Sequence, residues 1–321
     1  MISPHDGRMR FSGVLVDEGI RLLERSLLPA CQKTGKKIFL LLSSHDVFLV
    51  QDETEAHGMH VVAGIKAHIL FDEDLYVCKS KVDDVICLRV SLDVLLKSLR
   101  SASAHDAEKL QIALRHRPLK ASNNGAAVPL IEICWSNESM NISQEIPIEK
   151  PCPSSEVTRI RGLCSQDATC NFYLDIAPEL KAIMGILENL KIFSKTAVVC
   201  LTLDGDFHVI SESELSKIGV GFPSFDVFGS DGTATQNPKG TQQHVSIEER
   251  LAEAKRQERA YFMEIKVVHL YQVLRSVQLT SPARVLCGMA EDFSHVHIVL
   301  SYNDILDNTK VSTDRSFDFK I

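Results

Sequence analysis

The chain has 321 residues, 45% of them hydrophobic, and a formal net charge of −7. This length favours two domains of about 150 residues each, and the composition is that of a folded globular protein rather than a disordered or membrane-embedded one. No apolar run reaches the roughly 20 residues that cross a bilayer, so we expect no membrane partner. The negative charge argues against a protein whose whole surface coats nucleic acid, although it is compatible with a local basic face.

The first half of the chain predicts two helices on an antiparallel sheet. Alternating apolar residues indicate a strand over residues 9–16, and leucines at helical spacing indicate a helix from Asp17 to about Gln32. A second helix is expected over residues 91–102, with Ser91 as its N-cap. Further strands are expected over residues 36–44, 46–52, 59–70, 75–80, 85–90, 109–116, 128–136 and 140–148.

We expect the first domain to span residues 1–148 and a linker to span residues 149–170. The linker stretch is rich in proline and serine and shows no clear hydrophobic periodicity. The second domain, residues 171–321, repeats the pattern. Its helices are expected over residues 178–192 and 267–276, and its strands over residues 171–176, 197–203, 207–213, 217–225, 295–301 and 317–321.

An insertion at residues 226–259 interrupts the second domain. Its first part, Asp226–Gln243, is rich in Gly, Ser and Thr and is expected to be a flexible loop. Ser246 and Glu249 form a capping-box pattern that predicts a charged helix over residues 247–260. The insertion is either a solvated excursion or a segment that docks a partner.

Two stretches repeat at an offset of 175 residues, Leu92–Ser101 and Val267–Ser276. Leu95 corresponds to Leu270, Leu99 to Leu274 and Arg100 to Arg275. Since each stretch follows one predicted strand and precedes another, the repeat indicates a duplicated domain. We therefore predict an α+β fold of two duplicated domains, each with two helices packed on an antiparallel sheet.

Signatures of catalysis and cofactor binding are absent: the sequence has no GxGxxG after a strand, GxxxxGK[ST], HExxH or GxSxG. His295 and His297 would lie on one face of a strand, but they lack further ligands nearby, so two ordinary surface histidines are favoured over a metal site. Cys152, Cys164 and Cys170 are irregularly spaced and predict no zinc site. We expect neither catalytic residues, nor a metal, nor a cofactor.

Two polar clusters are also interpreted as structural. The run Ser43–Asp46 contains Ser, His and Asp, but a single turn does not separate a nucleophile, a base and an orienting acid in space. Asp72, Glu73 and Asp74 are most simply an acidic loop. The nine cysteines are an odd number without a CxxC pair, which favours reduced thiols within an intracellular protein.

The predicted helices carry cations on the sides opposite their apolar stripes. Each such residue taken alone is usually a solvated helix cation, but their recurrence on all four helices suggests a basic face. Acidic residues on the same helices, Glu18, Glu24, Glu179 and Glu188, weaken that face. The candidate DNA-facing residues are Lys97, Arg275, Arg100, Arg21, Arg25 and Lys181, and Lys191 lies on the third helix as well.

The chain resembles a sliding clamp of the PCNA type and, within that superfamily, the Hus-one family. The resemblance lies in Met9–Asp17 ("MRFSGVLVD"), in Asn141–Ile148 ("NISQEIPI") and in Val273–Asp304, which contains "VLRSVQLTSPARVLCGM" and "VHIVLSYND". It is patchy but spans nearly the whole chain. Met9 matches the usual start of the family, so Met1–Arg8 is an extension or reflects an upstream start codon, and the insertion is longer than the family's usual loop.

The resemblance implies a non-enzymatic subunit of the heterotrimeric DNA-damage checkpoint clamp, in the nucleus. Its partners would be Rad-nine and Rad-one type subunits, an ATP-driven clamp loader, repair and checkpoint proteins, and duplex DNA held without sequence specificity. Partner peptides would dock beside the linker, and edge strands would pair with neighbouring subunits. The alternatives are a homotrimeric replicative processivity clamp and, from a different class, a metal-dependent hydrolase that uses His295 and His297.

Overall fold

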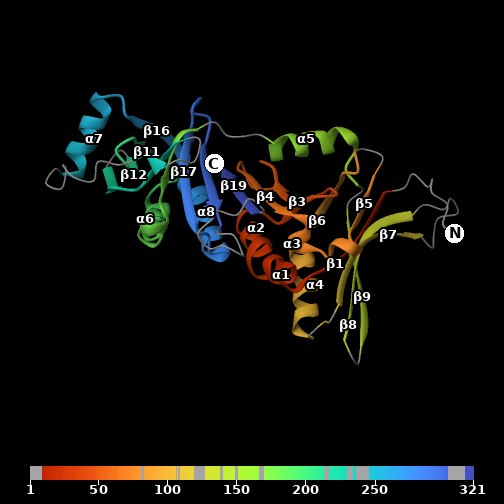
Figure 1. Ribbon diagram of the computed structural model, residues 1–321. Coiled ribbons are helices and arrows are strands. Elements are labelled where there is room, and N and C mark those ends of the chain that lie inside the picture. Colours follow the sequence, from red (N-terminus) through yellow and green to blue (C-terminus); the bar gives the residue numbers. More distant parts are fainter. Residues whose placement is uncertain are drawn as a thin grey trace. The chain divides into compact units, whose positions relative to one another are not determined.

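The computed structural model divides the chain into two compact units, residues 1–166 with 313–316 and residues 167–312 with 317–321. Figure 1 shows the helices and strands of each unit. The structure describes residues 9–80, 83–105, 107, 109–118, 127–137, 140–148, 151–165, 170–212, 217–229, 234–235, 246–302 and 315–321.

Two sets of antiparallel strands build the first unit. One is a five-stranded sheet in the order β5-β1-β7-β8-β9, formed by Val77–Lys79, Arg10–Leu15, Lys109–Pro118, Ala127–Ser136 and Asn141–Pro147. The other has the order β4-β3-β2-β6, formed by His60–Lys66, Asp46–Gln51, Lys37–Leu42 and Ile86–Ser91.

The second unit has the same two sets. Its strands β14-β10-β17-β18-β19 are Val227–Gly229, Cys170–Asp175, Arg284–Ala290, Val296–Ser301 and Arg315–Lys320. The short strand β15 (Ala234–Thr235) pairs with β14, so part of the expected flexible loop is a hairpin. The strands β13-β12-β11-β16 are Lys217–Phe222, Phe207–Glu212, Thr196–Thr202 and Ala260–Lys266.

Strand order confirms the duplication. β1 lies between β5 and β7 just as β10 lies between β14 and β17, and β2 lies between β3 and β6 just as β11 lies between β12 and β16. The helices α4 (Leu92–Ala104) and α8 (Val267–Thr280) begin 175 residues apart, as do β7 and β17. The predicted α+β fold of two repeated units is therefore correct.

In the first unit, the predicted first helix consists of α1 (Asp17–Arg21), the π-helical segment η1 (Leu22–Leu27) and α2 (Leu28–Thr34). The strand expected over residues 59–70 is wrong at its end, because β4 stops at Lys66 and Ala67–Leu70 form the short helix α3. The backbone bonds from Ala67 N to His45 O (2.7 Å) and from Val16 N to Leu70 O (3.0 Å) hold that turn in place. A 3-10 turn, η2 (Glu73–Leu75), precedes β5.

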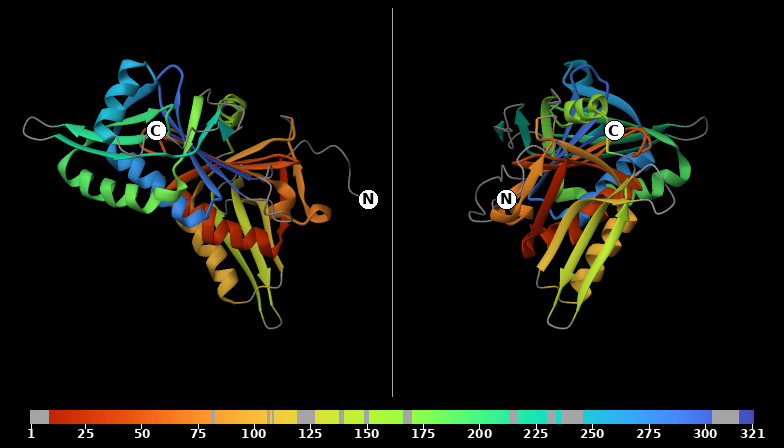
Figure 2. Two further views of the ribbon diagram at one scale, coloured as in Figure 1. Left: turned by 60° about the vertical axis from the view of Figure 1, so that its left-hand side comes forward. Right: turned by 90° about the vertical axis from the view of Figure 1, so that its right-hand side faces the viewer.

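In the second unit, the 3-10 turn η3 (Ala177–Glu179) leads into α6 (Leu180–Phe193), which lies beside α8 (Figures 1 and 2). The predicted charged helix is α7 (Ile247–Arg256), and its capping box is present: Ser246 Oγ accepts from Glu249 N at 3.2 Å and Glu249 Oε2 from Ser246 N at 3.1 Å. Ser91, by contrast, occupies the N-cap of α4 without a side-chain cap hydrogen bond. None of the helices that the structure describes is long and apolar enough to cross a bilayer.

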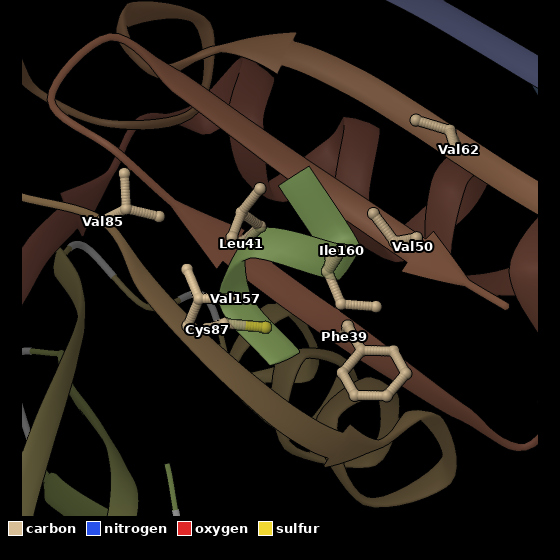
Figure 3. Close-up of a cluster of buried hydrophobic side chains, with 8 residues drawn as sticks. All are labelled: Phe39, Leu41, Val50, Val62, Val85, Cys87, Val157 and Ile160. Carbon is tan, nitrogen blue, oxygen red and sulfur yellow. The ribbon is translucent and has the colours of Figure 1, made fainter. Parts of the chain in front are cut away.

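The stretch predicted to be an irregular linker contains a helix, α5 (Ser154–Ser165). Val157 and Ile160, three residues apart, are buried against Phe39, Leu41, Val50, Val62 and Cys87 of the sheet and against Val85, which precedes β6 (Figure 3). Arg159 Nη2 donates to Asp52 Oδ2 at 2.8 Å beside this cluster. We expected partner peptides to dock beside this stretch. In the structure, α5 itself covers the apolar face of the sheet there.

We expect Ile160→Ala to destabilise the protein by about 2–5 kcal/mol, because removing a fully buried Ile side chain loses its transfer free energy and leaves a cavity. Urea unfolding measures the change. Ser155→Ala, on the exposed side of α5, is the matched control and should cost less than about 0.5 kcal/mol. Equal effects of the two substitutions would contradict the claim that packing of α5 on the sheet stabilises the protein.

Candidate nucleic-acid interface

The first unit places its two helices side by side, with polar ties across the contact. Ser103 Oγ on α4 donates to Glu24 Oε2 on η1 at 2.6 Å, and Gln32 of α2 donates to Asp93 of α4. Beneath these ties lie Leu95 and Leu99 of α4, 6% and 0% exposed. The helix pair is thus fixed by apolar burial on its inner side and by hydrogen bonds at its rim.

The second unit repeats this arrangement with different side chains. Tyr271 OH on α8 donates to Glu188 Oε1 on α6 at 3.2 Å, and Lys191 Nζ lies 4.0 Å from the centre of the Tyr271 ring. Leu270 and Leu274 of α8, the counterparts of Leu95 and Leu99, are fully buried. The leucines that the sequence repeat superimposes therefore have the same role in both units.

All six candidate DNA-facing cations are exposed at the surface of these helices. None forms an ion pair or a hydrogen bond with any other residue that the structure describes. Lys191 differs, since its ammonium is 3.7 Å from Glu188 Oε1 and covers Tyr271. The six are Arg21 on α1, Arg25 on η1, Lys97 and Arg100 on α4, Lys181 on α6 and Arg275 on α8.

Spacing places these cations in groups within each helix. Arg21 and Arg25 are four residues apart and Lys97 and Arg100 are three apart, so each pair lies on one face of its helix. Arg25 lies in the π-helical segment η1, a rare geometry that is over-represented at functional sites. Arg100 and Arg275, equivalent in the repeat, are both exposed. Such a surface can hold phosphate groups by charge, without reading bases.

Two acidic residues that weakened the basic face in the sequence are engaged in the cross-helix ties. Glu24 accepts from Ser103 and Glu188 accepts from Tyr271, so both have a structural role at the helix contact. Sequence reasoning missed these ties because each joins residues 79 or 83 positions apart. Glu18 is exposed on α1 and remains part of the charge balance of that surface.

The structure buries His297, where we expected a surface histidine, and leaves His295 partly exposed. His297 is 6% exposed, and its Nδ1 is 2.9 Å from Tyr173 OH, while the His295 ring centre lies 6.2 Å away. Burial, reinforced by Lys320 and His295, lowers the pKa of His297 to about 3 even though Asp318 Oδ1 is 3.8 Å from its Nε2. Among the residues that the structure describes, no three His, Cys, Asp or Glu side chains are arranged to hold a metal ion.

The other polar clusters are turns. Ser43 Oγ accepts hydrogen bonds from His45 N and Asp46 N, at 3.3 and 2.9 Å, and so closes the β2–β3 connection. Asp72 caps the turn η2 by accepting from Asp74 N at 3.0 Å. Both clusters serve the backbone, as the sequence predicted.

Burial of His297 predicts a pH-dependent stability. Below pH about 6.5 the unfolded chain protonates this histidine, whereas the folded chain keeps it neutral down to about 3. The unfolded state then binds more protons, so stability falls as pH falls through this window, with a slope approaching about 1.4 kcal/mol per pH unit. Between pH 7.5 and 5, the free energy of unfolding measured in urea should fall less for His297→Gln than for the wild type.

The control for this measurement is His45→Gln, at an exposed turn, which should keep the wild-type pH profile. If His297→Gln and the wild type lose the same stability on acidification, then the buried histidine is not the source of the pH dependence.

Solved structures with the same fold are sliding clamps. The proliferating cellular nuclear antigen (PCNA) of Entamoeba histolytica matches with a TM-score of 0.57 and 10% identity, covering 97% of both chains. PCNA of Thermococcus kodakaraensis matches with a TM-score of 0.56 and 13% identity, covering 97% of this chain and 98% of that one. At such identities the likeness shows the fold alone. A search of curated proteins gave no match.

The sequence also matches a protein family, described as Hus1-like protein, over residues 9–312. This is the Hus-one family that the sequence resembles, and the match covers nearly all of both units. This match shows that the chain belongs to the Hus1-like family, a non-enzymatic family, and the solved structures show that its fold is that of the PCNA clamps.

Proposed function

We propose that the chain is one subunit of a heterotrimeric ring that encircles duplex DNA at damage sites and there scaffolds checkpoint and repair proteins. The observation that carries the proposal is the set of six exposed cations, without ion-pair partners in the described part of the chain, on the helices of both repeated units. Membership of the Hus1-like family supports the checkpoint role.

A closed ring holds DNA by topology, so its contacts with DNA can be weak. Exposed Lys and Arg side chains such as Lys97 and Arg275 attract phosphates over about 8–10 Å at physiological salt, and each neutralised phosphate adds about 0.9 to the magnitude of the log–log salt slope. Because these contacts ignore base identity, the ring can slide. Loose cationic contacts therefore suit a clamp better than a sequence-specific binder.

Open sheet edges support assembly into a ring. In the part of each unit that the structure describes, β9 is the last strand of its sheet in the first unit, and β13 is the last strand of its sheet in the second. An unpaired edge offers free backbone N–H and C=O groups to another chain. A head-to-tail contact between different edges generates a ring when its rotation closes.

Apolar residues on α6 lie on the side of the open β13 edge. Phe193 is 70% exposed and lies five residues after Glu188, about 140° around the helix from the contact with α8. The sheet order is β13-β12-β11-β16, and α8 packs on β16. The side of α6 that faces away from α8 is therefore the side toward β12 and β13. Ala182 and Ile186 share it. A subunit that paired with β13 would therefore cover Phe193.

The other partners follow from the family. Rad-nine and Rad-one type subunits would complete the ring, and a clamp loader, which carries the ATP site, would open it around DNA in the nucleus. A homotrimeric processivity clamp is the alternative, and the oligomeric state of the purified chain distinguishes the two. A metal-dependent hydrolase has no support from the family or from the buried position of His297.

Charge reversal on the helices should weaken retention on DNA. We expect Lys97→Glu/Arg275→Glu, assembled with its partner subunits and loaded on nicked circular DNA, to dissociate several-fold faster than the wild type at physiological salt. Its log–log salt slope should fall in magnitude by about 1.8, the value for two lost phosphate contacts. Circular dichroism should be unchanged, because both side chains are exposed.

Arg10→Glu/Lys79→Glu is the matched control, with the same change in charge on the paired strands β1 and β5. It should keep the wild-type retention and salt slope. If the helix double variant also slides and dissociates like the wild type, then Lys97 and Arg275 are only solvated surface cations and do not serve the DNA contact.

Subunit assembly should depend on Phe193. We expect Phe193→Asp to weaken association with one partner subunit at least tenfold, measured by sedimentation of the mixed subunits, because a carboxylate would be buried at an apolar contact. Leu75→Asp, at a residue 43% exposed outside the helix pairs, should assemble normally. A purified wild-type chain that forms a stable homotrimer would instead support the replicative-clamp alternative.

A further inference from the structure

Three thiols gather where α5 covers the sheet of the first unit. Cys87 lies on β6, Cys152 lies two residues before α5 begins, and Cys164 lies in the last turn of α5. All three belong to, or pack against, the buried cluster that includes Val157 and Ile160. In Figure 3 the Cys87 sulfur lies close to Val157 of α5. Neither DNA binding nor ring assembly makes use of these thiols.

Cys87 and Cys152 are in direct contact. Cys152 N donates to Cys87 O at 3.1 Å, and both side chains pack in the same apolar cluster. In a sheet ladder, residues joined by such a backbone bond have Cα atoms about 5.5 Å apart, and disulfides span roughly 4.4–6.8 Å, so this bond brings Cys87 and Cys152 within reach of a disulfide. We propose that Cys87 and Cys152 form a reversible disulfide that fastens the start of α5 to β6.

The two thiols differ in their access to solvent. Cys152 is partly exposed, so it can meet a small oxidant, whereas Cys87 is 2% exposed beneath it. The hydrogen bond with Cys152 and burial raise the pKa of Cys87, which keeps it a thiol until its neighbour has reacted. This difference gives Cys152 the peroxidatic role and Cys87 the resolving role.

Hydrogen peroxide is the oxidant that the chemistry requires. The Cys152 thiolate attacks one peroxide oxygen, the O–O bond breaks, and the products are a sulfenic acid and hydroxide. The Cys87 sulfur then attacks the sulfenic sulfur, the S–O bond breaks, and hydroxide leaves with the Cys87 proton as water. The pair of thiols loses two electrons in all, and a dithiol reductant reverses the change.

The disulfide would act on α5 through the residue between Cys152 and the helix. Pro153 O accepts hydrogen bonds from Glu156 N and Val157 N, which form the first turn of α5, at 2.9 and 3.0 Å. Fixing Cys152 therefore fixes that turn. Oxidation would hold α5 on the sheet, whereas the reduced protein would keep only the apolar contact and the ion pair of Arg159 with Asp52.

Cys164 is the competing partner, because it lies near enough to Cys87 to interact electrostatically. Among the described residues, no backbone hydrogen bond joins it to β6, and burial raises its pKa too. The backbone bond between Cys152 and Cys87 favours their pairing over any pairing with Cys164. A metal is disfavoured, since no metal-binding group of three such side chains is present in the described residues.

The test treats the purified full-length chain with a small excess of hydrogen peroxide and maps its peptides by mass spectrometry without reduction. We expect a peptide linked through Cys87 and Cys152, which disappears with dithiothreitol. The thermal midpoint of the oxidised protein should rise by several degrees, and hydrogen exchange at the first turn of α5 should slow. Cys152→Ser should lose all three effects, and its partly exposed position should let it fold.

Cys164→Ser is the matched control and should still form the link with the same rise in midpoint. A Cys87–Cys164 or Cys152–Cys164 link in the wild type would overturn the proposal. Oxidation of Cys152 to sulfinic or sulfonic acid without any link would overturn it too. A link that forms without slowing exchange in α5 would refute the role assigned to the disulfide.

Discussion

Burial of a leucine stripe on one helix of each pair is the constraint on which the rest of the structure depends. Leu95 and Leu99 on α4, and their counterparts Leu270 and Leu274 on α8, are at most 6% exposed. With 3.6 residues per turn, fixing the leucines fixes which positions face solvent, so Arg100 and its equivalent in α8 must point outward. The basic surface is thus a geometric consequence of the core.

Polar contacts at the helix rims then adjust the charge that this surface presents. Glu24 and Glu188 bind hydroxyl groups of the neighbouring helix, which holds two carboxylates at defined places while the candidate cations remain without partners in the described residues. A protein with a net charge of −7 can in this way present cations on selected helices. Since exposed charges are screened beyond about 8–10 Å, local arrangement outweighs net charge for a DNA backbone in contact.

The sequence was sufficient for the repeat, for most of the strands and for the capping box of α7, because those depend on local period and spacing. It was insufficient for α5, because only Val157 and Ile160 of this helix are buried. The sheet residues that they contact lie about 70 to 120 positions earlier in the chain. The burial of His297 escaped prediction for a similar reason, since its cover comes from strands distant in sequence. Long-range packing decided both cases.

The covers on the outer sheet faces differ between the units although the sheets beneath them are duplicated. Arg159 of α5 pairs with Asp52, which follows β3, whereas Arg250 of α7 donates two hydrogen bonds to the buried Asp206, which precedes β12. β3 and β12 are equivalent strands in the two units. One ion pair lies at the C-terminal end of this strand and the other at its N-terminal end. Of the two, only the pair of Arg250 with Asp206 is buried, because the Arg159 side chain is about half exposed. The helices α5 and α7 are therefore not equivalent, and only the sheet and its helix pair belong to the repeated unit.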